Sequence, residues 1–174
     1  MSLILVHNVY IVYSLTCLQL MLGVPLEMVH RWWRVLLIYL TGVLAGSLAV
    51  AITDPGTYLA GASGGVYALI TAHLANVIFN WADMAYAPLR LATFLIVTGT
   101  DVGVAVYYRY ALEEETKISY VGHLAGATAG LLMGILVLRN LTQEDWETYL
   151  WWTCLAILAV LMGTGFIWNL VLIL

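Results

Sequence analysis

The stretch GASGGVYALITAHL, residues 61–74, places a single small hydroxyl, Ser63, between glycines at the start of an apolar run. Small residues in an apolar helix let a second helix approach closely, so helix packing is one explanation of this stretch. A serine beside a base is, in contrast, a nucleophile. The choice between the two depends on which side chains the rest of the chain brings to Ser63.

The composition is that of a membrane protein. Hydrophobic residues make up 63% of the 174 residues and charged residues only 9%, whereas a soluble domain is about half apolar and about a quarter charged. The net charge of −4 rests on few residues. It offers no basic face for nucleic acid or for anionic lipid, so a nucleic-acid partner is not expected.

The apolar runs are long enough to cross a bilayer, which takes about 20 mostly apolar residues in a helix. Six segments meet this requirement: 3–22, 34–53, 63–80, 89–109, 119–138 and 149–173. Short connections join them. The sequence therefore predicts an all-α, polytopic transmembrane helix bundle that forms one domain over residues 1–174. Within it, Pro25 is expected to end the first helix.

Basic residues indicate the orientation of this bundle. The odd-numbered connections carry Arg31, Arg34, Arg90 and Arg139, and the even-numbered ones carry Arg109 and Lys117. Because cytoplasmic loops have an excess of Lys and Arg, the odd connections are predicted to face the cytoplasm. Whatever the orientation, the third and fifth segments run in the same direction.

The fifth segment supplies a base. It carries glycines every four residues, at 122, 126, 130 and 134, and His123 lies beside this stripe. An ionisable side chain within a bilayer is costly and by default functional. His123 and Ser63 are expected at similar depth, about 6 Å apart along the membrane normal. If the glycine stripe packs on the third segment, His123 meets Ser63 and can take its proton, which predicts acyl transfer to the serine.

No acidic residue near His123 would complete a triad. Tyr67 follows Ser63 by four residues on the same helical face, so its ring is expected to pack against the imidazole. The glycines themselves are explained by packing.

The motifs GASGGVYAL, AHLAN and GHLAGATAG resemble those of the rhomboid intramembrane serine proteases. LGVPLEMVH, GSLAV, HLANVIFNW and VLRN are similar to stretches of the animal secretase-type rhomboids, so the resemblance covers nearly the whole chain from about residue 18. It implies that Ser63 is the nucleophile and His123 the general base, supported by Gly61, Gly64, Tyr67, Gly126 and Gly130. It implies no cofactor.

The same resemblance implies a substrate class and a location. The expected substrates are single-pass transmembrane proteins such as growth-factor precursors, cleaved near their lumenal ends. The expected location is the secretory pathway or the plasma membrane, as a multi-pass protein embedded in the lipid bilayer.

Two features depart from the family pattern. No counterpart of the family's usual first helix and following lumenal loop precedes residue 3, so the expected fold is a rhomboid-like core lacking that helix. The family also carries a His and an Asn that donate to the oxyanion, and the matching positions here are Ile11 and Leu15. His7 and Asn8 are adjacent and a turn or more earlier, so they substitute poorly. One lost donor typically costs about 10²–10³ in rate, so weakened catalysis is expected.

Other functions remain as alternatives. The first is a catalytically weak or inactive rhomboid-like protein that binds transmembrane clients and affects their trafficking. A transporter is a more distant one, because no matching pair of broken helices is evident. The four histidines, His7, His30, His73 and His123, lack the short spacing of zinc ligands, so no metal site is expected. His73 and Asp101 near mid-membrane are interpreted as a structural pair, with a proton path as the alternative.

Overall fold

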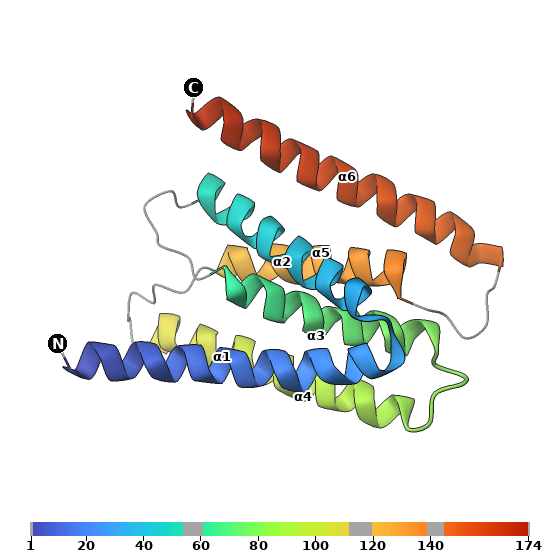
Figure 1. Ribbon diagram of the computed structural model, residues 1–174, viewed down its shortest axis with the longest axis horizontal. Helices are drawn as coiled ribbons and strands as arrows, with labels where there is room; N and C mark the ends of the chain where they lie inside the picture. The colour runs from blue at the N-terminus through green and yellow to red at the C-terminus, as the bar shows by residue number, and fades with distance from the viewer. Residues whose placement is uncertain (1, 54–60, 112–119, 139–144, 174) are drawn as a thin grey trace.

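The computed structural model describes residues 2–53, 61–111, 120–138 and 145–173. The helices in these ranges are α1 (Ser2–Val29), α2 (Trp32–Thr53), α3 (Ala62–Phe79), α4 (Ala87–Ala111), α5 (Tyr120–Val137) and α6 (Asp145–Ile173). Figure 1 shows a bundle in which α1, α3 and α5 run in one direction and α2, α4 and α6 in the other. The predicted all-α bundle is confirmed, and with it the parallel course of the third and fifth helices.

Within the described residues, five helices are long and apolar enough to cross a membrane. Their spanning stretches are Val12–Val29, Trp32–Thr53, Ala62–Phe79, Tyr120–Val137 and Asp145–Leu172. For α4 the corresponding apolar stretch, Ala87–Thr100, is shorter. The protein is a multi-pass integral membrane protein, and large apolar side chains that point outward, such as Phe166 and Trp168 on α6, suit contact with lipid.

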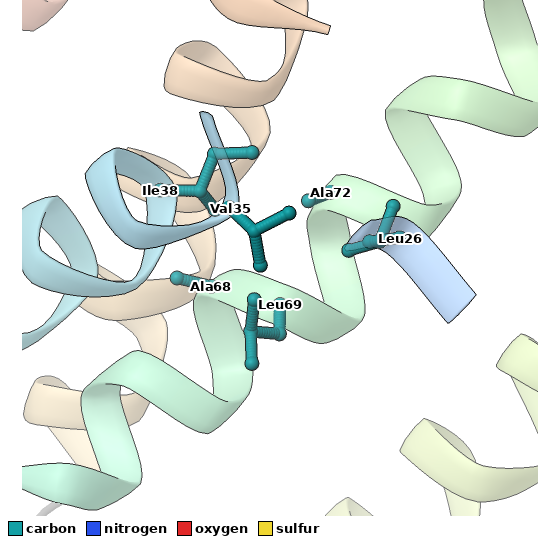
Figure 2. Packing of buried hydrophobic residues seen from close by; sticks show 6 residues of the cluster. All are labelled: Leu26, Val35, Ile38, Ala68, Leu69 and Ala72. Atoms are coloured by element: carbon teal, nitrogen blue, oxygen red, sulfur yellow. The ribbon is translucent and has the colours of Figure 1, made fainter. Parts of the chain in front are cut away.

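Helix α3 lies at the centre of the bundle. Half of the residues of Ala62–Phe79 are buried, against 6% of Asp145–Leu172. Figure 2 shows one side of α3 packed against α1 and α2. The buried residues of this cluster are Leu26, Val35, Ile38, Ala68, Leu69 and Ala72. Cys154 and Leu158 of α6 pack instead on Ala129 and Leu132 of α5, so α6 is an outer helix.

The prediction that Pro25 ends the first helix is wrong, because α1 continues to Val29. Leu26, only 1% exposed, packs on α2 and α3 directly after the proline. The Leu26 carbonyl then accepts the backbone N–H of His30 at 2.8 Å. Proline lacks an N–H and disfavours a helix interior, but membrane helices tolerate it where neighbouring helices hold the interrupted turn.

Helices α3 and α5 pack through their backbones. A Cβ added to Gly126 would lie 2.8 Å from the Cα of Gly64, and one added to Gly130 would overlap Ala68. A Cβ on Gly134 would lie 3.3 Å from the Cα of Ala72. Each step of four residues on α5 thus matches a step of four on α3. The two parallel helices stay in one register over about two turns, as small residues allow in lipid.

We expect Gly130→Ala to destabilise the bundle, because its methyl group would have to displace Ala68 of α3. The expected loss is about 1–3 kcal/mol in the free energy of unfolding, which is usual for overpacking, measured as a lower melting temperature in detergent. The matched control is Gly163→Ala on α6, where a Cβ meets no atom within 4 Å. Equal melting temperatures of the two variants would contradict the close α3–α5 contact.

Candidate active site

Ser63 lies in the first turn of α3, and α2 holds the entrance of this helix in place. Gly61 precedes the helix with φ −54° and ψ −20°. A Cβ on Gly61 would lie 3.3 Å from both Ser47 Oγ and Val43 Cγ1 of α2. A larger residue at 61 would press on α2, so the missing side chain lets the chain enter α3 close to its neighbour.

Three glycines from three helices meet directly beside the two predicted catalytic residues. A Cβ on Gly46 of α2 would lie 3.0 Å from the carbonyl oxygen of Gly122 on α5 and 3.5 Å from the Cα of Gly64 on α3. Gly64 follows Ser63, and Gly122 precedes His123. The backbones that carry Ser63 and His123 therefore converge on Gly46, at the end of the bundle where α3 and α5 both begin (Figure 1).

The imidazole of His123 is stacked on the ring of Tyr67. The ring centroids are 4.2 Å apart and the planes differ by 21°. Tyr67 lies one helical turn after Ser63, so this contact joins the Ser63 face of α3 to His123 of α5. A stacked aromatic pair contributes about 0.5–1.5 kcal/mol, enough to favour one orientation of the imidazole plane.

Ile11 and Leu15, the positions where the family pattern has its oxyanion donors, lie on α1, far from Ser63 and His123 in the sequence. Leu15 is a half-buried apolar side chain on that helix. The side chains of Ile11, His7 and Asn8 are outside the described part of the structure, so their contacts stay predictions. Among the described residues, no three His, Cys, Asp or Glu side chains come together in a group that could hold a metal ion.

His73 is linked to the backbone of α1. Its Nε2 donates to the carbonyl oxygen of Leu22 at 2.8 Å. Leu22 lies in the turn that Pro25 interrupts, since Pro25 has no N–H to donate within α1. The predicted partner, Asp101, has a side chain outside the described residues. The observed bond ties α3 to α1 and supports the structural interpretation of His73.

Further hydrogen bonds that the sequence analysis missed also connect neighbouring helices. Thr71 of α3 donates to Ala127 O of α5 at 2.7 Å, Gln19 of α1 to Tyr39 Oη of α2 at 2.9 Å, Trp151 of α6 to Leu136 O of α5 at 3.1 Å, and Asn169 of α6 to Leu48 O of α2 at 3.2 Å. Most of their acceptors are backbone carbonyls. Since every residue has a carbonyl, no pattern of side chains in the sequence points to these pairs.

Comparison with known proteins agrees with this arrangement of helices. Residues 6–140 match the model of the Rhomboid domain. Human Rhomboid-related protein 3 is 43% identical over 158 residues, which cover 88% of this chain and 39% of that protein. Mouse Rhomboid-related protein 2 is 44% identical over 140 residues, 78% of this chain and 46% of that protein.

One similar protein is named as inactive. Inactive rhomboid-related protein 2 of Caenorhabditis elegans is 35% identical over 140 residues, 80% of this chain and 40% of that protein. The chain thus spans less than half the length of these curated relatives. A similarity of this extent includes a protein named as inactive, so it does not by itself establish catalysis.

We expect His73→Leu to lower the free energy of unfolding by about 1 kcal/mol, the usual contribution of one hydrogen bond between membrane helices. Denaturant titration in detergent would measure the change. Thr164→Val on α6, which removes a hydrogen bond within one helix, is the control for a lost bond that joins no two helices. A stable His73→Leu protein that has nonetheless lost all reactivity of Ser63 would favour the proton-path alternative.

Proposed function

The chain belongs to the rhomboid family, and we propose on that basis that it is an intramembrane serine endopeptidase. Its proposed substrates are single-pass transmembrane proteins, cleaved near their lumenal side. The stacking of Tyr67 on His123, one turn from Ser63, is the observation that carries this proposal.

In the proposed reaction, Ser63 Oγ attacks the scissile peptide carbonyl while His123 takes the hydroxyl proton. The C–N bond then breaks as His123 returns this proton to the leaving amine, and an acyl-enzyme remains. A water molecule, deprotonated by His123, attacks the ester and releases the second product and Ser63. The role of Tyr67 is to hold the imidazole plane through both steps.

The start of α3 favours this chemistry electrostatically. Ser63 is the second residue of the helix, so its backbone N–H stands at the positive end of the helix dipole. Negative charge that develops on the substrate carbonyl oxygen is stabilised at such a position. This backbone donor is available to any residue at position 63, whereas the side-chain donors of the family pattern are replaced here by Ile11 and Leu15.

The second candidate function is that of a catalytically weak or inactive rhomboid-like protein that binds transmembrane clients and affects their trafficking. Ile11 and Leu15 favour it, because neither side chain can donate a hydrogen bond to an oxyanion. Both functions require the protein to bind a transmembrane segment. The rate of chemistry at Ser63 therefore separates them.

We expect a fluorophosphonate probe to label the protein in native membranes and Ser63→Ala to abolish the labelling, because only an activated hydroxyl attacks the probe. His123→Ala should reduce the labelling rate by at least about 10²-fold through loss of the general base. Ser47→Ala, which removes a hydroxyl of α2 beside Gly61, is the matched control and should label normally. A folded protein that takes up no probe would reject the protease and leave the client-binding function.

We expect the double variant Ile11→His, Leu15→Asn to cleave a model transmembrane substrate faster, by about 10²-fold or more, because each restored donor stabilises the oxyanion. Turnover in reconstituted liposomes measures the gain. Val12→His with Thr16→Asn places the same side chains one position further along α1, where both native residues are exposed, and should bring no gain. Equal rates for the two double variants would show that these positions do not limit catalysis.

A further inference from the structure

Thr71 extends the face of α3 that carries the proposed site. It follows Ser63 by eight residues and Tyr67 by four, so the three side chains lie on one side of the helix, a turn apart. Tyr67 contacts His123 of α5. Thr71 contacts Ala127, the residue one turn after His123 on the same helix. Two consecutive turns of α3 are thus joined to two consecutive turns of α5.

The hydroxyl of Thr71 is directed across the helix interface. Its Oγ1 lies 2.7 Å from the carbonyl oxygen of Ala127, and 3.1 Å and 3.2 Å from the carbonyl oxygens of Tyr67 and Ala68 in its own helix. A hydroxyl has one proton to donate, and the shortest contact is the one between helices. Other threonines of the described helices, including Thr16, Thr41 and Thr128, bond the carbonyl four residues earlier, which is the usual local bond of threonine in a helix.

The glycine contacts around this bond bring the helices close without determining their exact offset. Gly126 and Gly130 flank Ala127 and touch the backbone of α3 at Gly64 and Ala68. These contacts, which include the methyl group of Ala68, are van der Waals contacts without a preferred direction, so small shifts of one helix along or around the other cost little. A hydrogen bond of 2.7 Å, in contrast, depends on both distance and direction.

We propose that Thr71 is a positioning residue, whose hydrogen bond to Ala127 sets the register of α5 on α3 and so holds His123 against Tyr67 and towards Ser63. This inference rests on the proposed function, because it assigns Thr71 a role in the chemistry of the Ser63–His123 pair. Thr71 acts through α5 and does not touch the substrate. A displacement of about 1 Å at a catalytic base is enough to reduce a rate by about 10²-fold.

The test compares three changes at one position. Thr71→Val keeps the shape of the side chain and removes the hydroxyl, Thr71→Ser keeps the hydroxyl and removes the methyl group, and Thr71→Ala removes both. Thr128→Val is the matched control, since Thr128 follows Ala127 on the exposed face of α5 and donates to Leu124 O of its own helix. All variants are prepared as the full chain in detergent or bicelles.

The first measurement is the kinetics of fluorophosphonate labelling. We expect Thr71→Val to lower the labelling rate at saturating probe by about 10- to 100-fold, with little change in the probe concentration that gives half of that rate. Thr71→Ser and Thr128→Val should label at the rate of the unaltered protein. If Thr71→Val does not fold, Thr71→Ala against Thr71→Ser makes the same comparison.

The second measurement does not need reactivity. The ring protons of His123, assigned by their loss in His123→Gln, should be shifted upfield in NMR spectra by the stacked ring of Tyr67. This shift should diminish in Thr71→Val and persist in Thr71→Ser. If the unaltered protein takes up no probe but the shift depends on the hydroxyl at 71, the proposed protease fails while the positioning role stands.

Two results would overturn the inference. In the first, Thr71→Val matches Thr128→Val in both labelling rate and His123 shift. In the second, Thr71→Ser is as impaired as Thr71→Val, because then the methyl group and its packing, and not the hydrogen bond, would hold α5 in place.

Discussion

The contact between the backbones of α2, α3 and α5 is the constraint on which the rest of the structure depends. At Gly46, Gly64 and Gly122 the three helices lie so close that one added Cβ would come within 3.0 Å of a neighbouring carbonyl oxygen. In a bilayer, burial of apolar side chains does not drive helices together, because lipid is as apolar as the protein interior. Close packing and hydrogen bonds must supply the association. The glycines provide the close packing. Ser63 and His123 directly adjoin two of these glycines in the sequence, so the packing contact also assembles the proposed site.

Hydrogen bonds between helices complete this arrangement, and most end on a backbone carbonyl. A helical carbonyl that already accepts an N–H keeps a second lone pair, so it can bind a side chain from another helix without breaking its own. His73 uses Leu22 of α1 in this way, Trp151 uses Leu136 of α5, and Asn169 uses Leu48 of α2. Such bonds cross a different helix pair each time, so together they hold the outer helices α1 and α6 on the core of α2, α3 and α5.

The two halves of the proposed catalytic apparatus lie in differently packed parts of the fold. The Ser63–His123 pair is carried by α3 and α5, whose contact leaves no room for a methyl group at Gly126 or Gly130. The expected oxyanion donors belong to the first half of α1, where Val12 and Tyr13 are 64% and 70% exposed. Substitutions there leave the central packing intact, so a rhomboid core can lose oxyanion donors and keep its fold.

The sequence by itself determined the helices of the described residues and their direction, because long apolar runs have few alternatives in a membrane and the third and fifth runs are separated by a single one that returns. It also pointed to His123 and Tyr67, since an imidazole beside a glycine stripe and a ring one turn after Ser63 are visible as residue types at fixed spacing. It misjudged Pro25, because the burial of Leu26 on α2 and α3 outweighs the local preference of proline. Only the tertiary structure decided the partners of His73 and Thr71. Both bind backbone carbonyls, which every residue carries, so the choice among them depends on how closely and in which register the helices pack.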